Sequence, residues 1–585
     1  MPCVEAGSPA GGYYVVTHGI PAEPTRCPNQ KKSSMDSLRL FAAIIFLVSV
    51  FLLYEAWVKE RNPPATPQDT VQKSVTATPS PTLPPGASAP TSPTASPAKS
   101  AASNSTTLPV ITVRTDVLNA EIDPVGGVLR RLEFTRHKDK VDKNRNFVLF
   151  EHSADHTYVA QSGLIGDSLP NHTTVYRTVA SKYELGDGTD ELTVTLTAPE
   201  ANRIAVTKRI SFQRGSYLIN ESIQIVNNSS EELKPFAYFQ FLRDGKPAAG
   251  DSKMVPTYTG AAVYTDQSKF HKVTFADIDK SKVDYPKHAN DGWIAFVQHY
   301  FVAAWLQPGE TPREFYTRAL GNNLYAAGII VPAGNIAPHT SAQVGMRLYA
   351  GPQEQEKLAT LAPGLQLTVD YGWLTVIAAP LFWVLSAIQK WVNNWGVAII
   401  ILTIIIKLIF YPLSAASYKS MAKMRVLGPK MQKLKEQYGD DRQRIQQAKV
   451  EMYKTEKINP LGGCLPIVVQ IPVFIALYWV LLASVELRNA PFMLWITDLS
   501  AQDPYYILPV LMGITMIIQT SLNPTPPDPV QAKVMKIMPV VFSVFFFFFP
   551  AGLVLYWLVN NILSIAQQWQ ITRALERSKP AHVQR

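Results

Sequence analysis

A lysine lies within one of the most apolar stretches of the chain, AIIILTIIIKLIFYPLS at residues 398–414. Lys407 is roughly midway between Trp395 and Lys419, which a helix rising about 1.5 Å per residue would separate by about 36 Å. That length crosses the hydrocarbon core of a bilayer, so the ammonium would lie near the bilayer centre, where a charge is costly. An ammonium at that depth can attract an anionic group of another molecule, provided that water reaches it.

Polar side chains recur around Lys407 at the spacing of one helical face. Thr403 and Tyr411 are four residues away on either side, and Ser414 and Tyr418 extend the same stripe. Other apolar segments carry comparable groups: Gln470, Thr515, Gln519, Tyr556, Asn560, Ser564, and Gln567 or Gln568. Two interpretations are open, because these groups could line a hydrated concavity or could hydrogen-bond between helices and hold a bundle together.

The apolar segments that carry this stripe contain no Asp or Glu; the one acidic residue within any of the six apolar segments is Glu55, in the first. Ion-coupled transporters normally use intramembrane carboxylates, so the sequence disfavours a transporter. Cys3, Cys27 and Cys464 fit no metal or disulfide framework. The sequence therefore gives no argument for a metal site.

The segments that must position the stripe predict six membrane spans. They cover residues 38–58, 396–418, 464–485, 505–521, 534–549 and 552–571. The first is longer than the apolar region of a signal peptide and no small-residue cleavage site follows it, which indicates an uncleaved anchor. Residues 371–395 are rich in Trp and interrupted by Pro380, which favours an amphipathic helix at the membrane interface.

Four further segments complete the organisation. Residues 1–34 have no periodicity, and we expect translation to begin at Met35. Residues 59–108 are rich in Pro, Ser, Thr and Ala and are predicted to be a linker. Residues 109–350 alternate apolar and polar positions between turn signals, which predicts an antiparallel β-sandwich. Residues 419–459 have a helical pattern broken at YGDD, which predicts a helical hairpin.

Charge in the loops predicts the orientation. The loop at 419–459 contains eleven Lys and Arg residues, whereas the loop at 486–504 contains one basic residue, Arg488. By the positive-inside rule the first loop is cytoplasmic and the second is external. The loop at 522–533 and the basic tail at 572–585 are then cytoplasmic, as is the N-terminus. The predicted fold class is a polytopic α-helical membrane protein with six spans, an external β-sandwich and a cytoplasmic helical hairpin.

This topology gathers the polar groups in the cytoplasmic half of the membrane. We expect them to make a hydrated concavity that is open to the cytoplasm and closed on the outside, where Ile, Leu, Val and Phe predominate. Water there would remove most of the cost of Lys407. The net charge of +10 indicates anionic partners such as lipid headgroups, nucleic acid or acidic polypeptides.

Long motifs in this half of the chain resemble a known family. They are YPLSAASYKSMAKMRVLGPKMQKLKEQYGDD from Tyr411, KINPLGGCLPIVVQIPVFIALYWVL from Lys457, SVELRNAPFMLWITDLSAQDPYYILPVLMG from Ser484 and FPAGLVLYWLVNNILSIAQQWQI from Phe549. They are similar to the YidC insertases of Gram-negative bacteria, within the YidC/Oxa/Alb family. LNAEIDPVGGVLRRLEF from Leu118 resembles the start of the periplasmic domain of that family, whose fold is similar to sugar-mutarotase sandwiches.

The resemblance implies a membrane protein insertase or chaperone of the bacterial inner membrane, working alone or with the Sec translocon. Its substrates would be nascent membrane proteins, received in a groove and released into the bilayer, and its basic hairpin would meet the ribosome and anionic lipid. Such insertion needs no covalent chemistry, so we expect no catalytic residue, no metal and no cofactor, and a protein that is not an enzyme. Where the family usually has an arginine in the groove, this chain has Lys407, which keeps the charge and loses the planar fork of donors. The other groove positions implied are Phe474, Met512, Phe545, Tyr556 and Trp557.

A different class of function also fits part of the chain. The β-sandwich could be the active part of an envelope-anchored carbohydrate-binding or scaffold protein. That interpretation leaves the polar stripe unexplained. It also predicts that removal of residues 109–350 abolishes function, whereas an insertase would keep much of its activity.

Overall fold

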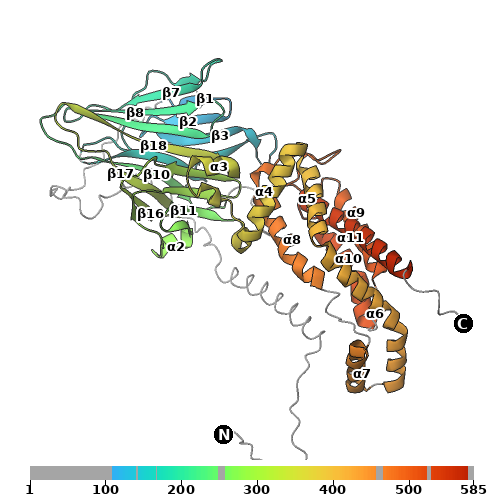
Figure 1. Cartoon of the computed structure of the whole chain (residues 1–585). Coiled ribbons are helices and arrows are strands. Elements are labelled where there is room, and N and C mark those ends of the chain that lie inside the picture. The colour runs from blue at the N-terminus through green and yellow to red at the C-terminus, as the bar shows by residue number, and fades with distance from the viewer. Residues whose placement is uncertain are drawn as a thin grey trace, which may run out of the picture. The chain divides into compact units, whose positions relative to one another are not determined.

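The structure is a computed structural model that describes residues 109–139, 142–166, 168–247, 257–439, 441–455, 465–523 and 529–577. The predicted N-terminal extension, start at Met35, first span and linker lie outside these residues, as do residues 456–464, 524–528 and 578–585. The described chain contains a β domain followed by a group of helices (Figure 1).

The β domain is a sandwich of two sheets. Its strands are β1 (Ile111–Arg114), β2 (Leu118–Asp123), β3 (Val128–Lys138), β4 (Asn146–His152), β5 (Thr157–Ile165), β6 (Lys182–Glu184), β7 (Glu191–Thr197), β8 (Ile204–Gln213), β9 (Leu218–Asn227), β10 (Phe236–Asp244), β11 (Thr259–Thr265), β12 (Lys269–Val273), β13 (His288–Ala289), β14 (Trp293–Gln298), β15 (Phe301–Leu306), β16 (Arg313–Gly321), β17 (Leu324–Pro332) and β18 (Thr340–Pro352). The predicted sandwich is confirmed, and the short helices α2 (Phe275–Asp279) and α3 (Gln355–Leu361) accompany it.

One sheet has ten strands in the order β13-β16-β17-β10-β5-β4-β3-β2-β1-β6, and the other has eight in the order β12-β11-β14-β15-β18-β9-β8-β7. The recorded strand pairs are antiparallel except β1 with β6, which is parallel and departs from the expected antiparallel pattern. Along β8, buried and half-buried positions alternate, as period-two sequence patterning requires when one face packs on a core. Trp293 and Trp305, 1% and 0% exposed, lie in the core between the sheets.

A buried charge cluster joins the two sheets inside this core. Lys208 of β8 is 0% exposed, and its ammonium donates to Gly126 O at 2.9 Å and to Ser162 Oγ at 2.7 Å. The carboxylate of Glu221 on β9 lies 3.4 Å from the same ammonium and accepts a hydrogen bond from Ser162. The ammonium is thus both paired and hydrogen-bonded. This is the condition under which a buried ammonium is tolerated in a protein core.

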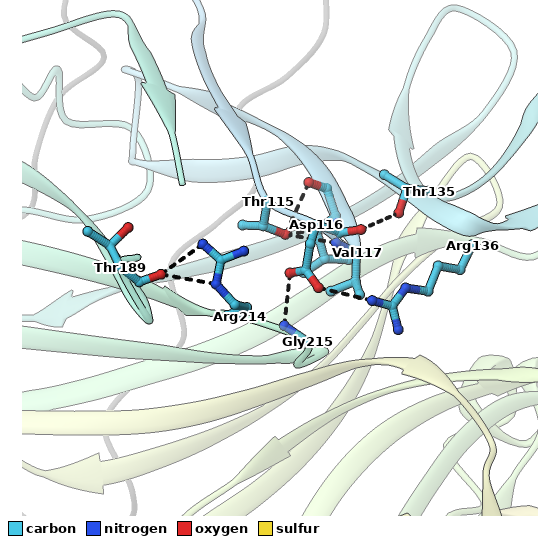
Figure 2. A network of polar contacts seen from close by, with 9 residues as sticks. Thr115, Asp116, Val117, Thr135, Arg136, Thr189, Arg214 and Gly215 are labelled. Carbon is cyan, nitrogen blue, oxygen red and sulfur yellow. Dashed lines mark hydrogen bonds and ion pairs between the residues drawn. The ribbon is translucent and has the colours of Figure 1, made fainter. Parts of the chain in front are cut away.

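At one end of the sandwich, three turns are tied together by polar contacts (Figure 2). Asp116, between β1 and β2, accepts from Gly215 N at 2.8 Å and from Arg136 Nη2 at 3.0 Å. Arg214, in the turn between β8 and β9, donates to Thr189 O and to Gly186 O. The loop that leads into β7 is therefore held against the β8–β9 turn.

The helical part follows the β domain. It contains η1 (Leu365–Thr368), η2 (Gly372–Leu374), α4 (Thr375–Val392), α5 (Trp395–Ile409), α6 (Tyr411–Tyr438), α7 (Arg442–Thr455), α8 (Leu465–Ala483), η4 (Val485–Leu487), α9 (Ile507–Leu522), α10 (Pro529–Phe546) and α11 (Ala551–Arg577). Ala398, Leu402, Leu477, Val480, Met512 and Val554 are among the buried residues of its own apolar core.

The segment predicted as one span at 396–418 is two helices in the structure. α5 ends at Ile409, and the axis bends by 64° before α6. Pro412 explains the break, because it has no N–H to continue the hydrogen-bond ladder and its ring would clash with the carbonyl four residues earlier, in the last turn of α5. The face that carries Thr403 and Lys407 therefore does not continue straight to Tyr411 and Ser414.

Length and composition identify few of the helices as spans in the described part of the chain. Gly372–Val392 is long and apolar enough to cross a membrane, and so is the bent pair Trp395–Ile409 with Tyr411–Met421 if it counts as one. Val469–Ala483 and Ile507–Leu522 are shorter apolar helices. The six spans therefore remain a prediction. α6 and α7 do contact each other, with Tyr453 OH 3.8 Å from Met431 Sδ.

α4, which lies within the predicted interfacial segment, has two different faces. Phe382 and Leu385 are buried, whereas Trp383 and Trp391 are 71% and 81% exposed. Exposed Trp side chains suit the headgroup level of a bilayer. Since the same helix is also long enough to span, its interfacial placement stays a prediction.

Candidate functional site

Lys407 is hydrogen-bonded to another helix of the bundle. Its ammonium donates to Ser564 Oγ on α11 at 2.7 Å, and Ser564 donates in turn to Asn560 O, one turn earlier in α11, at 2.7 Å. The serine hydroxyl is thus oriented by its own helix, with its lone pairs available to the ammonium. Asn394 is the N-cap of α5. Its side-chain oxygen accepts a hydrogen bond from Val397 N at 3.0 Å and so sets the start of the helix that carries Lys407.

A second helix reaches the same polar chain through an amide pair. Gln470 Nε2 on α8 donates to Asn560 Oδ1 on α11 at 2.6 Å. Lys407, Ser564, Asn560 and Gln470 therefore form a continuous polar chain across α5, α11 and α8, and we call it the Lys407 chain. These residue types, all donors or acceptors and none acidic, can hold water or the polar end of a peptide, and they supply one positive charge.

α9 contributes a separate polar contact. Asn561 Nδ2 lies 3.4 Å from Thr515 Oγ1, and Thr515 donates to Met512 O within its own helix. Further along α11, Gln568 Nε2 donates to Leu522 O and to Asn523 Oδ1, where α9 ends. Polar groups therefore connect α11 to α9 as well as to α5 and α8.

Aromatic rings lie beside the polar chain. Phe474 is one turn beyond Gln470 on α8, and its ring meets Trp557 edge to face with 4.4 Å between centroids. It also stacks on Tyr556 at 6.2 Å, and Phe546 approaches Trp557 at 5.4 Å. Such edge-to-face and offset pairs are the favoured arrangements of aromatic rings, so this cluster packs α8, α10 and α11 together.

The structure brings most of the predicted site residues together. Lys407, Gln470 and Asn560 share one chain, Thr515 reaches α11 through Asn561, and Phe474 joins Tyr556 and Trp557. Three others are placed differently: Thr403 is 1% exposed and bonds Ile399 O of its own helix, Tyr411 lies beyond the break and is 39% exposed, and Phe545 is 47% exposed. Met512 is fully buried and Gln519 is half-buried on α9.

One residue of the site, Asn561, was not among the candidates taken from the sequence. Ser564 was a candidate, because it is on the polar stripe of the last segment, four residues after Asn560. Asn561 lies next to Asn560 and off that stripe, so periodicity on one face gave no reason to select it. It serves a different neighbour, because adjacent helical positions point about 100° apart.

The opposite end of α11 is held by backbone contacts. Ala551 N donates to Ala501 O at 2.7 Å, and Gly552 N donates to Leu499 O at 2.9 Å. A Cβ at Gly552 would lie 3.1 Å from Leu499 O, so a larger residue would disturb this approach. Nearby, the buried carboxylate of Asp503 accepts from Trp495 Nε1 at 3.0 Å and from Leu508 N at 2.7 Å, which fixes the loop before α9.

In the ranges that the structure describes, no group of three or more His, Cys, Asp or Glu side chains is arranged to hold a metal ion. Within α5, α8, α9, α10 and α11 the single acidic residue is Glu576, near the end of α11. The polar groups of the helical part therefore offer binding and orientation, with a positive charge and without a carboxylate near Lys407 in sequence.

Family models match nearly all of the described chain. Residues 110–384 match the model described as the YidC periplasmic domain, and residues 387–579 match the model described as the 60Kd inner membrane protein. The crystal structure described as an active YidC insertase with its first transmembrane domain resolved is 18% identical, with a TM-score of 0.37, and the match covers 79% of this chain and 94% of that one.

Relatives from other bacteria match over almost their whole length. The membrane protein insertase YidC of Methylobacillus flagellatus is 56% identical, over 93% of this chain and 98% of its own. That of Aromatoleum aromaticum is 57% identical, over 93% of this chain and 99% of its own. The family resemblance inferred from the motifs is thereby confirmed, and with it the inner membrane as the location of such proteins and their classification outside the enzymes. The chain belongs to the YidC family of membrane protein insertases, with a periplasmic β-sandwich domain and a helical membrane part.

Proposed function

We propose that the Lys407 chain is the polar wall of a groove, open to the cytoplasm, that receives the hydrophilic tail of an incoming membrane segment. The observation that carries this proposal is the partner of the ammonium. Lys407 donates to a neutral hydroxyl, Ser564 Oγ, at 2.7 Å, so its charge is not neutralised by that bond and is available to an anionic tail. A positive charge that faces a hydrated space attracts acidic groups and tolerates its depth in the membrane.

The apolar part of the segment would leave the groove along apolar side chains. Phe474 lies beside the polar groups on α8, and Phe545 on α10 is exposed on the bundle. Met512 on α9 is fully buried in the apolar core next to Thr515 and would contribute to this path from within the bundle. Burial of apolar surface in lipid supplies the driving force, about 25 cal/mol per Å². No covalent bond is made or broken, so the contribution of the groove is to position and attract the substrate.

The topology proposed with this groove has six spans and both termini in the cytoplasm. Residues 38–58, 396–418, 464–485, 505–521, 534–549 and 552–571 would cross the membrane, residues 371–395 would lie at its outer surface, and α6 with α7 would form the basic cytoplasmic hairpin. Anionic lipid and the ribosome are the partners that its charge favours. The substrates would be nascent inner-membrane proteins, with the Sec translocon as a further partner.

Three substitutions at Lys407 test the charge. Lys407→Arg should keep insertion, because the charge is retained. Lys407→Ala should reduce insertion of acidic-tailed substrates by about tenfold, the effect of a charge-assisted interaction of roughly 1.5 kcal/mol. Lys407→Glu should be worst. Insertion is measured by protease protection of model substrates with acidic or neutral tails in proteoliposomes, and equal activity of all variants would reject the charge-based account.

A second candidate function rests on the β domain. A cleft of about 520 Å³ is lined there by polar residues such as His288, Asn290 and Glu314 and by apolar residues such as Phe236 and Pro312. Mixed polar and apolar walls are typical of small-ligand sites, which supports a carbohydrate-binding or scaffold role as the second candidate. Deletion of residues 109–350 separates the two candidates, because the groove proposal expects insertion of a model substrate to persist and the second expects it to vanish.

A further inference from the structure

The four outermost strands of the β domain differ in how they are protected. In the described chain, β6 and β13 are edges of the ten-stranded sheet and have three and two residues. β12, an edge of the other sheet, carries Lys269 and Lys272. Short length and lysine are two usual ways to prevent an edge from pairing with another strand. The fourth edge, β7, has seven residues, ELTVTLT, with no Lys, Arg, Pro or Gly.

The backbone of β7 presents unpaired groups on its outer side. The even-numbered residues of β7 hydrogen-bond to β8. This follows from the register and from the two bonds at the ends of the same ladder, in which Arg214 N donates to Asp190 O and Ala198 N donates to Val206 O. Hydrogen bonds of an antiparallel strand alternate between its two sides, so the N–H and C=O of Glu191, Thr193 and Thr195 point outward. No described residue is recorded as bonding these backbone groups.

The outer side of β7 already accepts a strand partner at one end. Thr197 N donates to Arg177 O at 2.8 Å, and Arg177 N donates to Thr197 O at 2.9 Å. At the other end, the contacts of Arg214 with Thr189 and Gly186 hold the preceding loop (Figure 2). The edge is thus fixed at both ends, and between them its outward backbone groups have no backbone partner among the described residues, which leaves it preorganised for an added strand.

Exposed apolar side chains accompany the segment that pairs with Thr197. Val175 and Val179, two residues to either side of Arg177, are 45% and 98% exposed, and Val125, which pairs with Val175, is 40% exposed. A strand added beside β7 would find backbone donors and acceptors together with apolar side chains near one end. An extended segment with apolar residues at alternate positions has the complementary chemistry.

We propose that the outer edge of β7 binds an extended, unfolded polypeptide segment with apolar and β-branched residues at alternate positions, as an added antiparallel strand of the eight-stranded sheet. This binding site is separate from the groove and does not depend on it. A second copy of the chain is less suitable, because paired β7 strands would place Thr193 and Thr195 opposite each other and leave the valines without apolar partners.

The test uses the full chain in lipid nanodiscs and a peptide of sequence IAVTKRISFQ, that of residues 204–213, which pairs with β7 from the other side. The peptide should slow hydrogen exchange at the amides of Thr193 and Thr195, measured by mass spectrometry of overlapping fragments. Thr195→Pro removes one outward N–H, a change that edge strands tolerate, and should weaken binding by about tenfold or more. Thr195→Val changes the side chain at the same position and keeps the N–H, so it should bind like the native chain.

A peptide N-methylated at two adjacent central residues loses donors on both of its edges and should not bind to the native chain. This result does not depend on whether the variants fold. Equal binding of the methylated and unmethylated peptides would overturn the proposal, as would equal binding by Thr195→Pro and Thr195→Val. So would the absence of binding at millimolar peptide. Protection of Thr193 and Thr195 that rises with protein concentration in the absence of peptide would identify a second copy as the occupant and reject an unfolded segment.

Discussion

Lys407 and Ser564 are joined by a hydrogen bond of 2.7 Å between α5 and α11. The hydroxyl of Ser564 accepts from the ammonium and donates to Asn560 O at 2.7 Å, so its orientation is fixed from both sides. The serine positions the ammonium and adds no charge of its own. Position and charge can therefore be separated by mutating the two residues independently.

Ser564→Ala should reduce insertion of acidic-tailed substrates less than Lys407→Ala does. Loss of a single hydrogen bond costs about 1 kcal/mol, whereas the charge remains. Protease protection of the model substrates measures both. Ser543→Ala on α10, which removes a hydroxyl bonded at 3.3 Å to Pro509 O, is the matched control and should leave insertion unchanged. A Ser564→Ala defect as large as that of Lys407→Ala would show that geometry matters more than charge.

Lys208→Met should destabilise the β domain strongly. It removes the ammonium that compensates Glu221, and breaking a buried ion pair on one side costs about 3–5 kcal/mol. The double change Lys208→Met with Glu221→Leu should recover part of this loss, because no unpaired charge then remains. Urea unfolding followed by tryptophan fluorescence measures the difference. Lys234→Met, at an exposed pair with Glu232, is the control and should change stability by less than about 0.5 kcal/mol.

The stability of the β domain should depend on His137 below neutral pH. Burial, reinforced by the charges of Arg488, Lys357 and Arg136, lowers the pKa of His137 to about 4 from its usual 6.5. Between these values the unfolded chain binds a proton that the folded chain does not, so stability from His137 is present above pH 6.5 and is lost as the pH falls towards 4. Thermal unfolding of the native chain and of His137→Leu should diverge in this window, with the variant less sensitive to acid.

The native chain must be compared with His137→Leu because another buried group, Glu486, gives stability the opposite dependence on pH. Burial raises the pKa of Glu486, in the loop between α8 and α9, to about 7. Its contribution is present at low pH and is lost as the pH rises through 7. A native chain and a His137→Leu variant with parallel pH profiles would contradict the assignment to His137.

Alanine at one glycine of the helical part should destabilise the bundle. A Cβ at Gly396, in the first turn of α5, would lie 2.0 Å from the ring of Phe492, so Gly396→Ala should destabilise the packing of α5 against the loop that carries this ring. Thermal unfolding in detergent measures the change, and a stabilised Gly396→Ala variant would contradict this packing.

The polar chain was largely predictable because side chains four apart on a helix share a face. Lys407 and Asn560 were selected in this way, and Gln470 as a polar residue at the same expected depth. The structure joins Lys407 to Asn560 through Ser564, which lies on the stripe of α11, and Gln470 donates to Asn560. Asn561 could not be found from one stripe, because α11 contacts α5, α6, α8 and α9 and so uses more than one face. Which helices are neighbours is a property of packing between distant segments.

Two other differences between the predicted and the observed structure have separate causes. The alternation of apolar and polar residues predicted the sandwich, but the parallel pair of β1 with β6 depends on a long-range connection that period-two patterning does not encode. The cause of the break after α5, Pro412, is present in the sequence. Continuous hydrophobicity on both sides of it favoured one span, and the missing N–H of the proline and the clash of its ring with the carbonyl four residues earlier decided otherwise.

That break changes the electrostatics of the lysine. Because α5 ends at Ile409, Lys407 lies in the last turn of the helix, where the final carbonyl groups have no partners further along the same helix. The aligned peptide dipoles give this end a partial negative charge, and a cation there is stabilised by about 0.3–1 kcal/mol or more when it is partly buried. The helix terminus thus acts as a built-in counter-ion for Lys407, weak enough to be replaced by a carboxylate.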